Sequence, residues 1–343
     1  MGLNEKFFKT SAVDDTPNFA PILYTGNWNG SNTNTIEVGF RPDWIWIKRK
    51  DGADSHHLYD SVRGMGKALY SNTTDPENAS NHLNTTSTGF TLVTDNVNQN
   101  NNQFIAWCWK AGGAAVPNTE GTRNTQVSAN VDAGFSVFTA STNNTNGFLT
   151  YGTGLSQPPD LVIYKRTNGS GAWSVASPLL LDTQYLVLND SAAVATLGQT
   201  IHSYSNTTFG IRNSYQTSNG YDLVFYAFHS VNGYQKIGKY TGNGNNAGTI
   251  VNTGFTPSYL MIKSVNTNDN GGGAWIIYDN ARSTSNPRAK RLFANFDAQE
   301  ATNVNYNLDF LTGSTKGFQP LNGASGGWGF NTLNVDYIYL AIA

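Results

Sequence analysis

The segment Asp43-Trp-Ile-Trp-Ile-Lys48 places four large apolar residues in a row between two charged ones. A short continuous run of aromatic and β-branched residues is typical of a strand that is buried on both faces. The segment Gly89-Phe-Thr-Leu92 instead alternates apolar and polar residues, as a strand with one wet face does. Asn, Gly, Asp and Thr separate such runs, which is turn chemistry. No stretch keeps amphipathic helical spacing over three turns, so we predict an all-β chain.

The same order of motifs occurs three times along the chain. Two copies place Gly-Phe-x-Pro before an aromatic-rich strand that ends in lysine, at Gly39-Phe-Arg-Pro42 and Gly254-Phe-Thr-Pro257. The same two copies contain Tyr-Asp-x-x-Arg, at Tyr59-Asp-Ser-Val-Arg63 and Tyr278-Asp-Asn-Ala-Arg282. The middle copy keeps the proline-to-lysine strand within residues 158–166 but has lost Tyr-Asp-x-x-Arg. A repeat of about a hundred residues indicates one structural unit per copy.

The repeat divides the chain into three units, an N-terminal segment and a linker. A propeller would need at least four blades, and a β-helix would need much shorter repeats. We therefore predict three tandem antiparallel β-sandwich units, jelly-roll-like or lectin-like, arranged in a row. The glycine-rich stretch before the middle copy is predicted to be the linker. The predicted segments are an N-terminal attachment segment 1–20, unit one 21–113, linker 114–126, unit two 127–233 and unit three 234–343.

The bulk composition argues against several classes of partner. Only 13% of the residues are charged and the net charge is −2. Lys and Arg are scattered, whereas a phosphate backbone calls for a basic stripe, so we expect no nucleic-acid partner. No stretch approaches the roughly 20 apolar residues of a membrane span, so we expect no membrane partner. The single cysteine, Cys108, lies in an apolar run and is expected to be a buried thiol.

The sequence offers little catalytic chemistry. Asp60 with Arg63 and Asp279 with Arg282 occur in two copies, and a duplicated pair is typical of a structural ion pair that fixes a turn. His56 and His57 are adjacent, and neighbouring side chains on a strand point to opposite faces, so they do not suggest a metal site. Glycine clusters lack the residues of a phosphate loop. We expect no enzymatic activity, no cofactor and no metal.

The asparagine-rich loops at residues 96–103 and 142–146 suggest a different chemistry. Amide side chains can satisfy sugar hydroxyls without charge, and a nearby aromatic face can stack on a sugar ring. Four tryptophans near such loops are candidate glycan-binding residues. They are Trp28, Trp173, Trp275 and Trp328. The alternative is that each of these tryptophans packs inside its own sandwich.

The motifs also resemble a repeat that is common in structural proteins of tailed phages, including marine and cyanobacterial phages. The resemblance covers roughly residues 20–343. It implies a virion protein of the kind labelled tail-fibre or host-recognition component, and it carries over no catalytic residues. The segments that support it are Tyr240-Thr-Gly-Asn-Gly244, Gly254-Phe-Thr-Pro257, Trp44-Ile-Trp-Ile-Lys48, Tyr59-Asp-Ser-Val-Arg63 and Ile105-Ala-Trp-Cys-Trp-Lys110.

These observations lead us to expect a non-enzymatic virion protein in a tail fibre or similar appendage. It would be assembled in the host cytoplasm and exposed outside the cell. Its partners would be other virion proteins and a host cell-surface glycan, in a homo-oligomer for which a trimer is one form.

Two alternatives stay open. In the first, the protein decorates the capsid as a head fibre or forms part of the tail or neck without binding a receptor. Phe7, Phe8 and Phe19 lie outside the repeat and would then attach the chain to another subunit. In the second, the protein is a polysaccharide-degrading spike, which would need two carboxylates about 5–10 Å apart.

Overall fold

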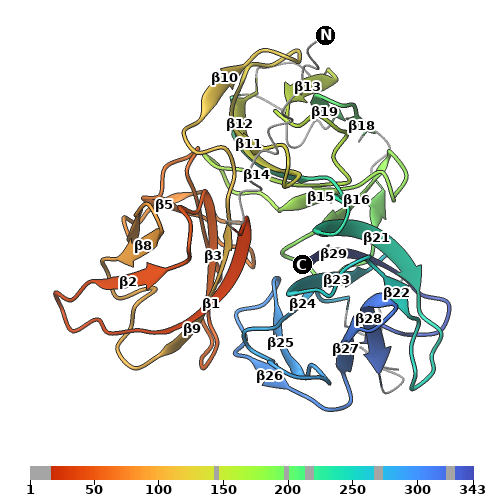
Figure 1. Ribbon diagram of the computed structural model, residues 1–343. Helices are drawn as coiled ribbons and strands as arrows, with labels where there is room; N and C mark the ends of the chain where they lie inside the picture. Colours follow the sequence, from red (N-terminus) through yellow and green to blue (C-terminus); the bar gives the residue numbers. More distant parts are fainter. Residues whose placement is uncertain (1–16, 143–146, 197–200, 213–219, 266–272, 322–328) are drawn as a thin grey trace, which may run out of the picture.

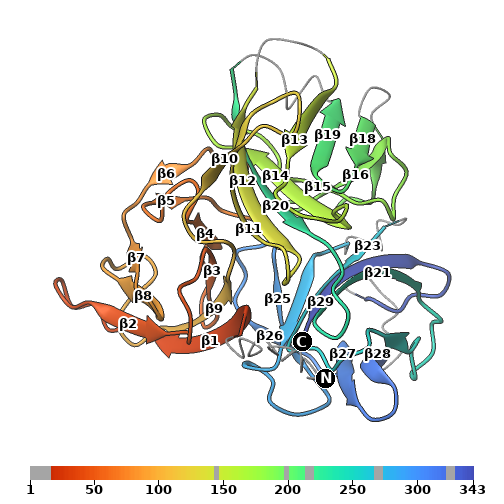
Figure 2. The ribbon, with the colours of Figure 1, turned by 45° about the horizontal axis from the view of Figure 1, so that its top comes forward.

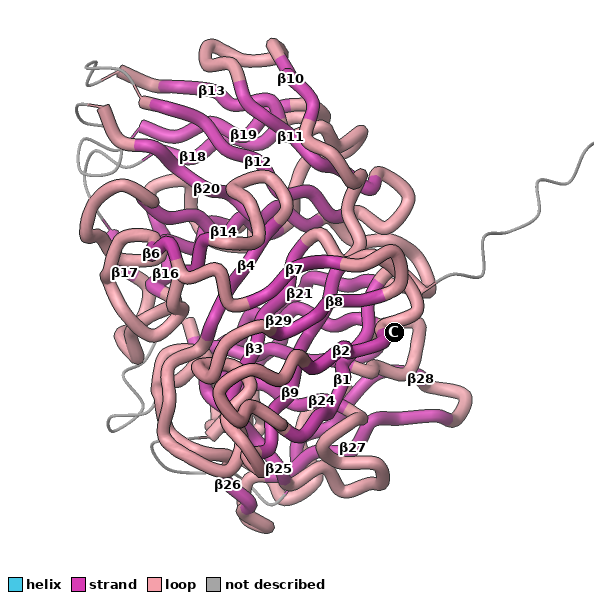
Figure 3. The backbone as a smooth tube through the Cα atoms, turned by 90° about the vertical axis from the view of Figure 1, so that its left-hand side faces the viewer, coloured by secondary structure: helices cyan, strands magenta, loops and turns pink. Residues whose placement is uncertain are grey.

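The computed structural model describes residues 17–142, 147–196, 201–212, 220–265, 273–321 and 329–343. The described residues form strands, turns and loops and contain no helix (Figure 3). Each strand ladder is antiparallel, as in the pairing of β1 (Phe19–Thr25) with β9 (Gln103–Trp109). The prediction of an all-β chain with several antiparallel sheets is therefore confirmed.

The first unit (residues 17–113) consists of two main sheets. The large sheet has the strand order β1-β9-β3-β4 and the small sheet has the order β2-β8-β7. A two-stranded ladder, β5-β6, lies beside them. The further bounds are β2 (Asn34–Glu37), β3 (Trp44–Arg49), β4 (His57–Asp60), β5 (Lys67–Ala68), β6 (Asn78–Ala79), β7 (Leu83–Thr85) and β8 (Gly89–Leu92).

The second unit (residues 114–233) has the same plan with a longer large sheet. Its sheets have the orders β10-β11-β12-β20-β14-β15-β16-β17 and β13-β19-β18. The bounds are β10 (Val116–Asn118), β11 (Thr125–Asn130), β12 (Phe135–Ser141), β13 (Leu149–Gly152), β14 (Leu161–Arg166), β15 (Ser174–Ala176), β16 (Gln184–Val187), β17 (Ala195–Thr196), β18 (Ile201–Tyr204), β19 (Thr208–Arg212) and β20 (Asp222–Phe228).

The third unit (residues 234–343) follows the plan again. Its sheets have the orders β21-β29-β23-β24-β25-β26 and β22-β28-β27. The bounds are β21 (Gln235–Thr241), β22 (Val251–Asn252), β23 (Tyr259–Ser264), β24 (Ile276–Asp279), β25 (Lys290–Phe293), β26 (Ala301–Thr302), β27 (Asn307–Thr312), β28 (Lys316–Leu321) and β29 (Asp336–Ile342).

The predicted linker needs correction. Residues 114–126 include β10 and the start of β11, and these strands extend the large sheet beyond β12. Among the described residues, no strand is added next to β1 in the first unit or next to β21 in the third. A short strand was hidden here because the stretch is rich in glycine and contains Pro117, which is tolerated in β10 because β10 lies at the edge of the sheet.

Both faces of each large sheet are buried. In β3, Ile45 and Ile47 belong to the core between the two sheets of the first unit. Trp44 and Trp46 point the other way, into a central core to which all three units contribute. Successive strand residues point to opposite faces, so the continuous apolar run serves two cores at once.

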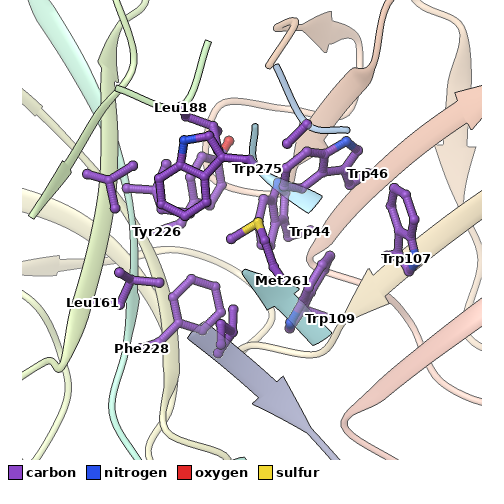
Figure 4. Packing of buried hydrophobic residues seen from close by; sticks show 14 of the residues in the cluster. Trp44, Trp46, Trp107, Trp109, Leu161, Leu188, Tyr226, Phe228, Met261 and Trp275 are labelled. Carbon is purple, nitrogen blue, oxygen red and sulfur yellow. The ribbon is translucent and has the colours of Figure 1, made fainter. Parts of the chain in front are cut away.

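The units form a closed three-membered ring rather than a row (Figures 1 and 2). In the central core, the Trp44 ring lies 4.4 Å from that of Tyr226 in the second unit. The Trp109 ring lies 5.8 Å from that of Tyr259 in the third unit. Figure 4 shows side chains of all three units meeting there, including Met261 and Trp275. We call the contacts of units one and two, two and three, and three and one the first, second and third junctions.

Candidate functional site

At one equivalent position in each unit, the side chain forms a hydrogen bond across a junction. This residue lies just before the strand that follows the proline-to-lysine strand, and its side-chain N–H donates to a main-chain carbonyl of the neighbouring unit. The donation always runs in the same direction around the ring. The bonds are Trp173 Nε1 to Tyr70 O (2.8 Å), Trp275 Nε1 to Val187 O (2.8 Å) and His56 Nε2 to Phe293 O (2.9 Å).

The geometry around His56 fixes its proton. Trp46 Nε1 donates to His56 Nδ1 over 2.8 Å, so the ring proton lies on Nε2, where it is donated to Phe293. Burial lowers the pKa of His56 well below its usual value, with a further contribution from Lys48. The pKa of His57 falls to about 3, mainly through burial, with the nearby His82 as the next cause. Both rings are therefore neutral, and His56 connects the first unit to the third. The described residues contain no cluster of three or more metal-ligating side chains.

The predicted glycan-binding tryptophans do not form a surface site. Trp173 and Trp275 are fully buried, so their prediction as exposed platforms is wrong. They do not pack only within their own sandwiches either, because they bond and pack across junctions. Trp28 is half-buried, and Trp328 lies outside the described residues.

The predicted attachment residues also differ from expectation. Phe19 is buried in β1 and its ring lies 4.9 Å from that of Trp109, so it is not available to attach the chain to another subunit. Phe7 and Phe8 lie outside the described residues.

Both predicted ion pairs are present, with matching geometry. Arg63 Nε and Arg282 Nε each donate to Oδ2 of the aspartate three residues earlier, over 2.6 Å in both cases. The side chains of all four residues are almost fully buried. Each aspartate also accepts a bond from the next unit. Tyr226 OH donates to Asp60 over 2.8 Å, and Trp107 Nε1 donates to Asp279 over 3.0 Å.

The second unit has replaced the whole set. The pairing of β14 with β15 has the same register as the pairing of β3 with β4 and of β23 with β24. This register places Ser177 at the position where the other two units have aspartate. Three residues later, the arginine position is Leu180. The closing strand of the third unit places Leu340 where Trp107 and Tyr226 stand, so the hydrogen-bond donor is gone too. Removing acid, base and donor together leaves no buried charge unpaired.

A third repeated feature, absent from the sequence-based site, is the lysine that ends each proline-to-lysine strand. Lys48, Lys165 and Lys263 are fully buried, and burial lowers their pKa values to about 8, about 8 and about 7. Lys165 donates to Thr74 O across the first junction, and Lys263 to Ser191 O across the second. Lys48 donates to carbonyls of its own unit. The signal in the sequence for these buried lysines is that a lysine recurs at the end of the proline-to-lysine motif in all three units.

The asparagine-rich loops are partly structural. Asn98 Oδ1 accepts from Asn27 N over 3.0 Å, and Asn98 Nδ2 donates back to Asn27 Oδ1 over 3.0 Å. Asn331 and Asn243 repeat this reciprocal clamp in the third unit. Since Asn98 and Asn331 are fully buried, they fix loop ends and are not available to a ligand.

A hollow with a volume of about 690 Å³ lies at the first junction. We call it the junction groove. One wall is the turn after β4 together with Lys67 and Glu77, and the other is formed by the ends of β11, β12 and β20. Its lining is Val62, Arg63, Lys67, Glu77, Thr122, Arg123, Asn124, Thr125, Gln126, Thr139, Ala140, Ser141, Thr167, Asp222 and Leu223.

Arg123 is held rigidly at this groove. Its Nε and one terminal nitrogen both donate to Ser141 O, over 3.0 and 2.8 Å. Ser141 Oγ in turn donates to Asp222 Oδ1 over 2.5 Å. A guanidinium fixed by two bonds loses little freedom when its remaining N–H groups bind a ligand. The groove is therefore a polar site with at least one preorganised cation.

The fold and this groove define an all-β protein of three fused sandwich units with a polar groove between two of them. The chain belongs to the family described as a domain of unknown function, DUF7483, whose model matches residues 14–343. No curated protein and no solved structure matches it. The described part of the chain contains no helix with the length and hydrophobicity that a membrane span requires.

Proposed function

We propose that this chain is a non-enzymatic structural protein of a phage virion, in a tail fibre or similar appendage that contacts host surface glycan. The observation that carries the proposal is how the buried ionisable groups are used. The ion pairs of Arg63 and Arg282 and the lysines Lys165 and Lys263 are bonded within the ring or across its junctions. Groups so occupied have their charges paired or hydrogen-bonded inside the protein and build a rigid scaffold.

The surface chemistry supports the same proposal. The chain has few charged residues and many Asn, Thr and Gly residues, which suits a protein that stays in solution outside a cell. The junction groove presents hydroxyl and amide groups, which match sugar hydroxyls. The motif resemblance to tailed-phage structural proteins supports the proposal that this scaffold belongs to a virion.

Immunogold labelling of particles of the phage that encodes the chain tests the location. Label on the tail appendage is the expected result. Label on the head or neck would replace the tail-fibre proposal with the decoration or neck alternative, and absence from the particle would overturn the virion proposal. Release of reducing sugar from host polysaccharide by the purified protein would overturn its non-enzymatic part.

A further inference from the structure

The junction groove lies at the first junction, on the side where the second unit adds β10 and β11 to its large sheet. Gln126 in β11 lies opposite Thr139 in β12, and both line the groove. The first unit supplies the facing wall from a turn whose shape is fixed by the buried Asp60–Arg63 pair. The site is thus built by two units and widened by the added strands.

The open hydrogen-bonding groups in the groove include two amides, which donate and accept, and two cations, which only donate. Asn124 and Gln126 are exposed, and their side-chain amides form no hydrogen bond with the rest of the described chain. The side chain of Lys67 is 48% exposed and has one acidic partner, Glu77. Arg123, which lines the groove, uses two of its three side-chain nitrogens on Ser141 O, and the third forms no hydrogen bond with the rest of the described chain.

The two carboxylates of the groove are already engaged. Glu77 accepts from Lys67 over 2.9 Å and from Arg63 over 3.4 Å, using a different oxygen for each. Asp222 accepts from Ser141 Oγ on one oxygen and from Asn168 Nδ2 on the other. A ligand therefore meets exposed cations and free amides beside two carboxylates whose oxygens each already accept one hydrogen bond, which favours a hydroxyl-rich ligand that carries a carboxylate.

We propose that the junction groove binds a segment of acidic polysaccharide, with a uronate carboxylate at Arg123 and Lys67 and sugar hydroxyls at Asn124 and Gln126. This rests on the proposed function and names its ligand class and site. The volume of about 690 Å³ is in the usual range of about 300–1,000 Å³ for ligand pockets. The absence of an aromatic side chain from the groove lining favours hydrogen bonding and charge over ring stacking.

Calorimetric titration of the full chain with a hyaluronan octasaccharide and a polymannuronate octasaccharide, against neutral maltooctaose, tests the ligand. We expect at least one uronate probe to bind about tenfold more tightly than maltooctaose, with affinity falling as salt rises because exposed charges are screened. Equal binding of maltooctaose, no binding of either uronate, or equally tight binding of a poly-glutamate peptide would overturn the proposal.

Variants then test the place. The double variant Asn124→Ala/Gln126→Ala removes two amides that form no hydrogen bond within the described chain, and Lys67→Gln removes a cation. Each of these changes should weaken uronate binding several-fold. Gln126→Glu should abolish it by adding a negative charge. Lys239→Gln, an exposed lysine in the third unit paired with Asp336, is the matched control and should bind as the parent does. Unchanged binding by all groove variants would overturn the site, whereas the immunogold result would stand independently.

Discussion

Asp279 accepts hydrogen bonds from two units at once, from Arg282 in its own turn and from Trp107 across the third junction. Replacing it with alanine leaves the Arg282 guanidinium buried without its nearest counter-charge. We expect Asp279→Ala to lower the free energy of unfolding by about 3–5 kcal/mol, the usual loss when one partner of a buried pair is removed. Urea denaturation measures this change.

The matched control for that prediction is an exposed pair. Lys239 and Asp336 are 3.3 Å apart with side chains 41% and 28% exposed. Lys239→Gln should change the free energy of unfolding by less than about 1 kcal/mol. If Asp279→Ala cost no more than Lys239→Gln, the buried network would not hold the third junction.

The buried histidines make stability depend on pH. His56, His57 and His202 have folded pKa values below the ordinary value, mainly because of burial, at about 3 for His57 and about 4 for His202. As pH falls below about 6.5, the unfolded chain binds protons that the folded chain does not, so stability is lost. Between about pH 7.5 and about pH 5.5 we expect each histidine to remove about 1 kcal/mol.

Urea midpoints measured at the two pH values test this, with His56→Gln as the comparison. Glutamine can accept from Trp46 and donate to Phe293 but does not titrate, so the variant should lose about 1 kcal/mol less on acidification. An identical pH dependence in parent and variant would contradict this, because it would show that folding leaves the pKa of His56 unchanged.

For individual residues, the sequence predicted the ion pairs correctly but did not predict which tryptophans are exposed. The duplication of Asp-x-x-Arg identified two ion pairs that the structure contains. The position of a tryptophan near a polar loop did not predict that its side chain is exposed. A tryptophan at such a position can equally well be buried between two units. Trp173 shows this, since it is flanked by polar and glycine residues in the sequence yet fully buried.

The close approach of β2 and β8 depends on a glycine. A Cβ on Gly89 would lie 2.0 Å from Ile36 O, and Gly317 meets Val251 O in the same way in the third unit. We expect Gly89→Ala to destabilise the protein by about 1–3 kcal/mol, because the strands must separate. Gly313 has open space around its Cβ position and is the control; Gly313→Ala should be neutral or slightly stabilising. Thermal unfolding of both variants checks this, and equal melting temperatures would contradict it.

The three units treat the outer edge of the large sheet differently. Just outside the two ends of β1, Asn18 O accepts from Lys110 N and Gly26 N donates to Asn102 O. Because residues of a strand alternate in direction, Pro21 has its missing N–H on the outer edge, where no partner is needed. In the second unit β11 covers the edge. In the third, Ser230 Oγ bonds to the main chain of Ile237. Pattern alone predicted the main strands, but β10 and β11 were missed because their apolar residues are few.

The whole molecule should unfold as one cooperative unit, because the central core draws on all three units. Trp275→Ala in the third unit should cost about 3–5 kcal/mol and expose the first unit as well. Cys108 in the first unit is fully buried and burial raises its thiol pKa, so its labelling reports opening of that unit.

We expect Trp275→Ala to raise the rate of Cys108 labelling more than about 100-fold if labelling requires global unfolding. Leu333→Ala, at a leucine that is 60% exposed in the same unit, is the control and should leave the rate unchanged. Normal protection of Cys108 in Trp275→Ala, alongside loss of third-unit structure, would show that the units open separately.

The ring itself was beyond prediction from the sequence. Continuous apolar runs such as residues 44–47 indicate that both faces of a strand are buried, but they do not say what covers the second face. Sandwiches packed in a row and sandwiches closed into a ring would have the same apolar pattern in their strand sequences. The junction groove depends on this choice, because its two walls come from residues 62–77 and residues 122–223 and meet only when the first two units pack together.

The coordinated change at Ser177, Leu180 and Leu340 has a consequence for how such a ring can diversify. In an assembly of three identical chains, a substitution appears at every contact at once and must suit all of them. Here each contact is encoded by separate codons, so one corner can be rewritten while the other two keep their original chemistry. A single chain can thus acquire one specialised face on a threefold frame.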